Sequence, residues 1–200
     1  MNRRVCTYAA AAIAALAIGA AGCGSSGPAA QSSSGDSAAP TRTVLPSPTS
    51  IASCSGQSWG SAPITVTHRV AVPPVPVIKD VRVAQHPECG YDRVVLDVNG
   101  PVPGYSVRYV AAIVRDASGQ TISIPGARYL LVTLRPAQAH SEAGAPTVPS
   151  AIQLPGYPAL ASWVLAGDFE GAVKIALGLA GQASIRTGEL PGRIYVDIKE

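Results

Sequence analysis

Residues 193–199 read Arg-Ile-Tyr-Val-Asp-Ile-Lys, and every second residue of this stretch is an aliphatic one. Successive side chains of a β-strand point to opposite faces, so this alternation predicts a strand with one buried and one exposed face. The same period recurs in four further segments, 64–72, 94–98, 121–124 and 129–135. Turn signals rich in Gly and Pro separate such segments, for example at 99–101 and 191–192. The sequence therefore predicts an all-β fold, an antiparallel β-sandwich.

Residues 160–179 are apolar nearly throughout, so periodicity alone does not distinguish a strand from a helix there. Gly167-Asp168 and Gly171 interrupt the run. We predict a hairpin with strands near 161–166 and 172–178, and a short helix beginning after Pro158 is the alternative. Residues 137–150 show no period and are predicted to form a loop.

The amino terminus has the layout of a secretory signal peptide. Arg3 and Arg4 precede an unbroken run of 13 Ala, Ile, Leu and Gly residues, Ala9 to Ala21. Thirteen helical residues span about 20 Å, whereas a bilayer core needs about 30 Å. The run is therefore too short to span a membrane, and we assign residues 1–22 to a signal peptide.

The run ends at Ala20-Ala21-Gly22-Cys23, which resembles the lipobox of bacterial lipoproteins. The resemblance implies that Cys23 is lipidated, becomes the first residue of the mature chain and anchors it to the membrane outside the cytoplasm. Stable anchoring needs two or more acyl chains, which a diacylglyceryl group supplies. Ordinary secretion with Cys23 as an unmodified thiol and a retained short anchor are the alternatives.

A linker with few large apolar residues follows. Of the 35 residues from Gly24 to Ser58, eleven are Ser, five Ala and four Pro, and only Asp36 and Arg42 are charged. Such a segment buries too little apolar surface to offset its ordering entropy, so residues 23–58 are predicted to be a disordered tether. Its reach is roughly 30 Å by the scaling for flexible chains. The folded domain is then expected over residues 59–200.

The four cysteines divide by position. Cys6 lies in the signal peptide and Cys23 is the expected lipid attachment site. Cys54 and Cys89 remain, and in an oxidising compartment they are predicted to form a disulfide. A metal or redox pair is the alternative.

Composition disfavours several function classes. A formal net charge of +3 is too small for a typical nucleic-acid binder. The three histidines form no H-E-x-x-H pattern, so no metal site or cofactor is predicted. Asp92 and Asp97 are five residues apart in one strand, which places them on opposite faces and argues against a paired acid–base site. We therefore predict a protein that is not an enzyme; a hydrolase is the weaker alternative.

Three stretches, 86–97, 103–110 and 190–198, resemble the AMIN-like domain of bacterial lipoproteins. The last is also similar to the end of the AMIN domain, the noncatalytic module that precedes the catalytic domain of cell-wall amidases. The resemblance covers roughly residues 59–200. It implies an envelope β-sandwich that binds peptidoglycan or a cell-wall assembly partner. The alternative is a small-ligand-binding or complex-subunit lipoprotein, which would need a deep apolar pocket between the sheets.

Five residues are candidates for ligand contact. Tyr91, Asp92 and Arg93 form either a polar corner that contacts a glycan or, as we favour, a strand start where Asp92 and Arg93 make structural hydrogen bonds and Tyr91 packs. Tyr105 and Tyr157 each follow Pro-Gly and could present a ring to a sugar.

We expect structural roles for both tryptophans. Trp163 is expected in the core. Trp59 is expected to cover one sandwich edge, tied down through Cys54.

Overall fold

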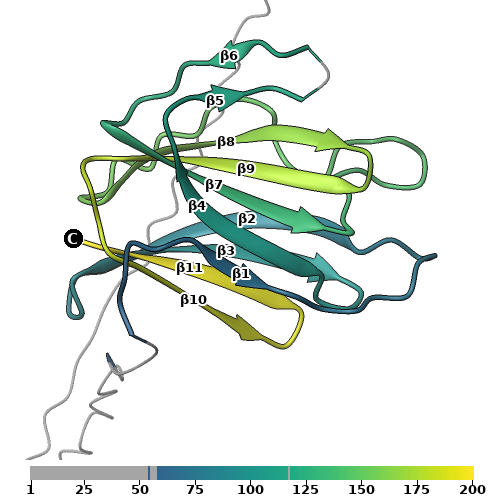
Figure 1. The fold of residues 1–200 in the computed structure, drawn as a ribbon, viewed down its shortest axis with the longest axis horizontal. Coiled ribbons are helices and arrows are strands. Elements are labelled where there is room, and N and C mark those ends of the chain that lie inside the picture. The colour runs from purple at the N-terminus through teal and green to yellow at the C-terminus, as the bar shows by residue number, and fades with distance from the viewer. Residues whose placement is uncertain (1–53, 55–57, 117) are drawn as a thin grey trace, which may run out of the picture. The chain divides into compact units, whose positions relative to one another are not determined.

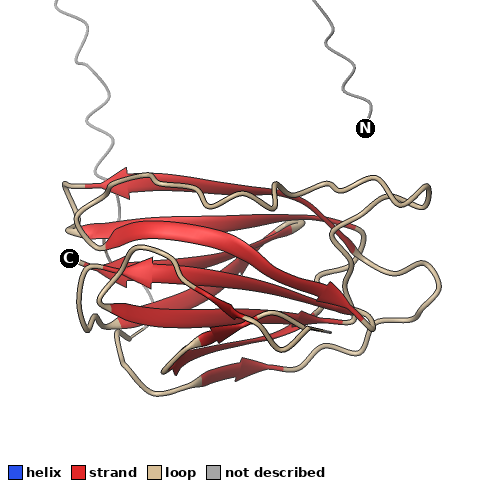
Figure 2. Cartoon of the chain, turned by 90° about the horizontal axis from the view of Figure 1, so that it is seen from above, coloured by secondary structure: helices blue, strands red, loops and turns tan. Residues whose placement is uncertain are grey.

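A computed structural model describes residue 54 and residues 58–116 and 118–200. In these residues the chain forms eleven β-strands. Figure 2 shows strands joined by loops, with no helix among the described residues. The described ranges accordingly contain no helix of the length and apolarity that crossing a bilayer requires. The predicted signal peptide, Cys23 and the linker apart from Cys54 and Ser58 lie outside the described residues.

Two antiparallel sheets stack face to face (Figure 1). One has five strands in the order β1 (Ile64–Val66), β4 (Gly104–Val110), β7 (Arg128–Arg135), β9 (Ala172–Leu179) and β8 (Leu160–Phe169). The other has four strands in the order β10 (Ile185–Leu190), β11 (Arg193–Lys199), β3 (Tyr91–Asn99) and β2 (Val77–His86). A short hairpin, β5 (Ile113–Val114) with β6 (Thr121–Ile122), forms a third layer. The predicted all-β sandwich is confirmed.

The core lies between the two sheets and is built by strand alternation. In β3 and β11 every second side chain points inward and is almost fully buried, as the sequence predicts: Val94, Leu96, Val98, Ile194, Val196 and Ile198. Facing residues of the five-stranded sheet include Leu130, Val132, Ile175 and Leu177. Trp163 is in the same core with 4% of its surface exposed, which confirms the prediction for this residue.

Residues 160–179 form the predicted hairpin, and the helical alternative is wrong. β8 and β9 pair along their length, and Glu170-Gly171 makes the turn between them. Both turn residues have positive φ, 49° and 69°. Two-residue hairpin turns of type I′ require this conformation because its twist matches that of the strands. Residues 137–150 contain no strand and form the predicted loop.

Several strand predictions need correction. The strand expected over 64–72 ends at Val66, and residues 69–72 precede a proline-rich stretch that cannot supply ladder N–H groups. The strand expected at 121–124 ends at Ile122. β2 was not predicted, because a bulge between Ile78 and Asp80 breaks its alternation. β10 was not predicted either, since its inward positions include polar Thr187.

The β5–β6 hairpin covers part of the outer face of the five-stranded sheet. Ile113 and Ile124 pack there on Leu131, Val164 and other residues of a second apolar cluster. Lys174 donates to Asp116 at 2.5 Å, and Ser162 Oγ donates to the Pro125 carbonyl. Glycines permit the close approach: a Cβ at Gly178 would overlap the Pro125 carbonyl oxygen.

Gly178→Ala should therefore separate the hairpin from the sheet or shift β9. Overpacking of this kind costs about 1–3 kcal/mol. Urea unfolding should show a lower midpoint for Gly178→Ala, whereas Gly181→Ala is the matched control because an added Cβ there meets nothing within 4 Å. Equal midpoints for the two variants would contradict this packing.

Candidate functional site

The outer face of the four-stranded sheet carries an unusual set of side chains. Residues paired across the strands share a face, so Arg186 of β10, Asp197 of β11 and Arg93 of β3 lie side by side in one row. Tyr91, Tyr195 and Lys199 point to the same side, two residues along their strands. Trp59 joins them from the chain before β1. We call this set the arginine–aromatic face: Trp59, Tyr91, Arg93, Arg186, Tyr195, Asp197 and Lys199.

Asp197 is at the centre of this face and its side chain is fully buried. Arg93 donates two hydrogen bonds to it, from Nε to Oδ1 at 2.6 Å and from Nη2 to Oδ2 at 2.9 Å. Arg186 donates from Nε to Oδ2 at 2.7 Å. The hydrogen bonds to Asp197 raise the pKa of Arg93. One carboxylate thus holds two guanidinium groups in fixed positions.

The two guanidinium groups alternate with aromatic rings. Arg93 lies 4.3 Å from the centroid of Tyr195 and 5.3 Å from that of Tyr91. Arg186 lies 4.4 Å from the centroid of Trp59 and 5.0 Å from that of Tyr91. Each such contact is worth roughly 0.5–2 kcal/mol. The result is a rigid layer in which each ring keeps a cation beside it.

The Cys54–Cys89 disulfide holds Trp59 on this layer. The bond predicted from the cysteine count is present, with the two Cα atoms 5.4 Å apart. Arg186 donates from Nη1 to the Cys54 carbonyl at 3.3 Å, and Gly60 pairs with Ile185 at the start of β10. Trp59 therefore covers the β10 side of the four-stranded sheet, as expected for a residue that covers one edge of the sandwich.

The position of the Tyr195 ring depends on the absence of a side chain at Gly188. Tyr195 and Gly188 are paired residues of β11 and β10, and the Tyr195 ring fills the space that a side chain at 188 would take. A Cβ at Gly188 would overlap the Tyr195 hydroxyl. The ring therefore lies flat across the sheet, where it contacts Arg93.

A second carboxylate, Asp97, organises the opposite end of the sheet face. Arg82 donates from Nε and Nη2 to its two oxygens at 2.5 and 2.9 Å, and Arg193 donates from Nε at 2.8 Å. These hydrogen bonds, that from Arg82 above all, lower the pKa of Asp97. Unlike Arg186, both arginines are half exposed, with 50% and 49% of their side-chain surface open to solvent.

A family model for the AMIN-like domain matches residues 76–200, from the end of the proline-rich stretch to the last residue. The chain belongs to the AMIN-like family. No curated protein and no solved structure matches the chain. AMIN-like domains are noncatalytic and occur in extracytoplasmic proteins of the cell wall. Trp59 and Cys54 precede the matched residues, so the disulfide fastens an extra segment onto the AMIN-like domain.

The structure separates the three adjacent candidates of β3. Tyr91 and Arg93 belong to the arginine–aromatic face. Asp92 points the other way and is fully buried, where its Oδ2 accepts hydrogen bonds from the backbone N–H groups of Ala159 and Leu160, both at 2.8 Å. Asp92 therefore links the two sheets of the AMIN-like domain and is not accessible to a ligand. As predicted, Asp92 and Asp97 lie on opposite faces.

The two candidate tyrosines that follow Pro-Gly, Tyr105 and Tyr157, lie away from the arginine–aromatic face. Tyr105 was a candidate for presenting its ring to a sugar, but it is the second residue of β4 and points into the core with 4% of its surface exposed. Burial raises the pKa of its hydroxyl. Tyr157 lies before β8 and packs half-buried against the core. Neither joins Tyr91 and Arg93 on the sheet face.

The sequence alone did not identify Tyr195 and Arg186 as members of this face, because only strand register shows which distant residues share a face.

The three histidines of the chain lie in three separate places. His68 contacts Glu189 at 2.8 Å, His140 contacts Asp168 at 2.6 Å, and His86 stacks on Tyr91. The described ranges contain no group of three His, Cys, Asp or Glu residues that could hold a metal ion. None of the three histidines therefore has the companions that a metal site needs.

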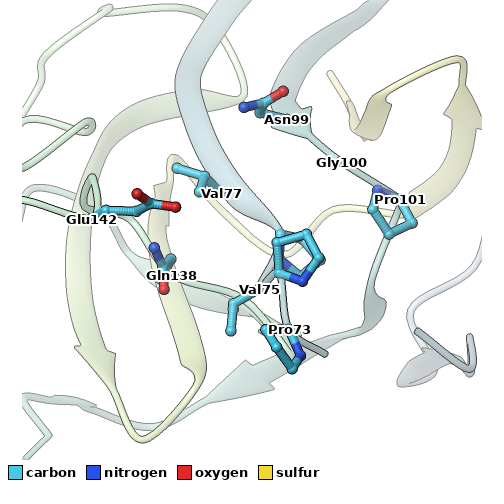
Figure 3. A pocket seen from close by; sticks show the side chains of 10 residues that line it. Pro73, Val75, Val77, Asn99, Gly100, Pro101, Gln138 and Glu142 are labelled. Atoms are coloured by element: carbon cyan, nitrogen blue, oxygen red, sulfur yellow. The ribbon is translucent and has the colours of Figure 1, made fainter. Parts of the chain in front are cut away.

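A hollow of about 410 Å³ lies where loops meet at the end of the sandwich (Figure 3). Glu142 and Gln138 line one side, and the segment from Asn99 to Pro101 lines another. Prolines 73, 74 and 76 supply much of the apolar surface. The hollow is formed by loops and strand ends, whereas a small-ligand carrier would need a pocket between the sheets.

The lowered pKa of Asp97 predicts that its contribution to stability is lost at low pH. A carboxylate whose pKa is lowered in the folded state adds stability above its ordinary value of 3.8 and loses it as the pH falls through the folded-state pKa. Wild type should therefore have a higher Tm than Asp97→Asn at pH 7, and the difference should shrink once the pH is below 3.8. Thermal unfolding between pH 7 and pH 3 measures this. A difference that stays constant over this range would contradict the role given to Asp97.

Proposed function

We propose that this chain is a lipid-anchored protein of the bacterial cell envelope whose AMIN-like domain binds peptidoglycan without catalysing a reaction. The arginine–aromatic face is the proposed binding surface. The observation that carries the proposal is the fixed row Arg93–Asp197–Arg186 between the rings of Tyr195, Tyr91 and Trp59. The family, with its noncatalytic domains of cell-wall proteins, supports the same conclusion.

The chemistry of the face suits a sugar polymer that carries carboxylates. Peptidoglycan offers sugar rings with apolar C–H faces and short peptides with acidic groups. Rigid aromatic side chains give large contact areas at a small entropy cost, and guanidinium groups pair with carboxylates. The buried Asp197 and the stacking contacts fix these groups before a ligand arrives, which reduces the ordering cost of binding.

The two outer faces of the sandwich differ in a way that favours this surface. The β5–β6 hairpin covers part of the five-stranded sheet and buries an apolar cluster there. In the described part of the chain no strand lies over the outer face of the four-stranded sheet (Figure 1). Four side chains of the arginine–aromatic face are exposed or half-exposed on this side of the domain, namely Trp59, Arg93, Tyr195 and Lys199. Tyr91, Arg186 and Asp197 are buried and hold the exposed side chains in place.

The amino-terminal segment supports a position in the envelope. A lipid on Cys23 would hold the chain at the membrane, and a tether over residues 23–58 would reach roughly 30 Å from it. This distance would bring the arginine–aromatic face towards the cell wall. The predicted disulfide, present in the structure, agrees with an oxidising compartment outside the cytoplasm.

Retention on purified sacculi tests the binding proposal. Wild type should sediment with sacculi at moderate salt, and the double variant Trp59→Ala/Lys199→Ala should lose most of this retention because it removes one ring and one cation from the face. The matched control is Phe169→Ala/Arg108→Ala, which removes one exposed ring and one exposed cation from the five-stranded sheet. Circular dichroism should confirm that both variants remain folded.

No retention of the wild type above an unrelated protein would overturn peptidoglycan binding and leave a cell-wall assembly protein as the partner class. Equal loss in the two double variants would overturn the choice of face.

Fractionation of cells tests the anchor. Wild type should remain with the membranes after a carbonate wash, whereas Cys23→Ser should move to the soluble or secreted fraction because it lacks the attachment sulfur. Cys6→Ser is the control, since this cysteine lies within the proposed signal peptide. Retention of Cys23→Ser in the washed membranes would refute the lipid attachment.

A further inference from the structure

We propose that the hollow beside Arg82 and Arg193 is a carboxylate subsite, so that this domain selects peptidoglycan whose stem peptides carry free carboxylates. The inference rests on the proposed function and gives it a chemical specificity. The ligand group is a carboxylate at the end of the four-stranded sheet, next to the arginine–aromatic face.

The hollow has the shape and charge for such a group. Its volume is about 510 Å³, and its cationic walls are Lys79, Arg82 and Arg193. Val98 and the turn Pro191-Gly192 close one side. The turn is fixed by a hydrogen bond from the Val98 N–H to the Gly192 carbonyl at 2.8 Å. Arg193 therefore projects from a short, rigid hairpin turn.

The arginines have unused hydrogen-bond donors. A guanidinium group has five N–H bonds in a fixed planar fork. Arg193 gives Asp97 a single hydrogen bond from Nε, so both of its terminal nitrogens remain available among the described contacts. Arg82 gives Asp97 its Nε and Nη2, which leaves Nη1 available. Asp97 thus orients two guanidinium groups without exhausting their capacity for an anion.

The charge balance of the whole sheet face favours an anion. Five cationic side chains point outward from the four strands, namely Arg82, Arg93, Arg186, Arg193 and Lys199. Three carboxylates share this face, namely Asp80, Asp97 and Asp197. Asp80 and Asp97 both line the hollow, where three cations exceed them by one charge. A ligand carboxylate would neutralise this excess.

The position next to the aromatic rings defines what the subsite would recognise. Arg193 and Tyr195 are two residues apart on β11, and their side chains point to the same side of the sheet. A sugar ring on Tyr195 would therefore place an attached peptide within reach of the hollow. Neutral glycan strands would use the rings alone and would lack the guanidinium contacts.

Chemically altered sacculi test the subsite. Three preparations are compared: native sacculi, sacculi with carboxylates converted to amides by carbodiimide and ammonia, and sacculi stripped of phosphodiester-linked polymers by hydrofluoric acid. Wild type should bind native and acid-stripped sacculi equally and amidated sacculi roughly tenfold more weakly, as expected for loss of charge-assisted hydrogen bonds. The variant Arg82→Gln/Arg193→Gln should bind native sacculi more weakly than wild type does, and amidation should weaken its binding by much less than tenfold, since only the cations of the arginine–aromatic face remain to contact a carboxylate. The control Arg108→Gln, an exposed cation on the other sheet, should behave as wild type.

Three other results would overturn either the carboxylate subsite or the proposed function. Equal binding of wild type to native and amidated sacculi would overturn the carboxylate subsite and leave peptidoglycan binding intact. Loss of binding to acid-stripped sacculi would overturn it too, because the anion would be a phosphate. No binding to native sacculi would overturn the proposed function itself. Circular dichroism and thermal unfolding of Arg82→Gln/Arg193→Gln verify that weaker binding is not due to unfolding.

Discussion

The arrangement of the outer sheet face depends on one buried carboxylate. Asp197 has no exposed surface, and an ionised group in such a place is stable only when its partners satisfy it. Three N–H groups of Arg93 and Arg186 do so. The same bonds fix the two guanidinium groups, and these fix the planes of Tyr91, Tyr195 and Trp59 beside them. Burial of one charge thereby defines a surface on the solvent side of a sheet.

Strand β3 serves both sides of its sheet at once. Its inward side chains, Val94 and Leu96, build the core, and Asp92 on the same side ties β3 to the start of β8 through two backbone N–H groups. Its outward side chains, Tyr91 and Arg93, build the proposed binding face. The core and the face therefore share one register, so a slip by one residue would destroy both. This coupling explains how a simple sandwich can hold the side chains of its outer face in fixed positions.

The sequence predicted the features that depend on local patterns. Alternation at 193–199 and 94–98 marked β11 and β3, and the cysteine count identified the pair Cys54 and Cys89. It failed where distant chain segments decide the outcome. Asp197 and Arg93 are 104 residues apart, so their pairing follows only from the β3–β11 register. Tyr105 followed a turn signal, yet its strand carries it into the core.

The two tryptophans provide a direct measurement of whether the arginine–aromatic face contacts peptidoglycan. Trp59 lies on the face, whereas Trp163 lies in the core with 4% of its surface exposed. Their two indole N–H signals can be followed by NMR while a soluble peptidoglycan fragment is added. If the face binds the fragment, the Trp59 signal should shift in a saturable way and the Trp163 signal should not. An unmoved Trp59 signal, with saturable shifts at the hollow around Pro73, would contradict binding at this face.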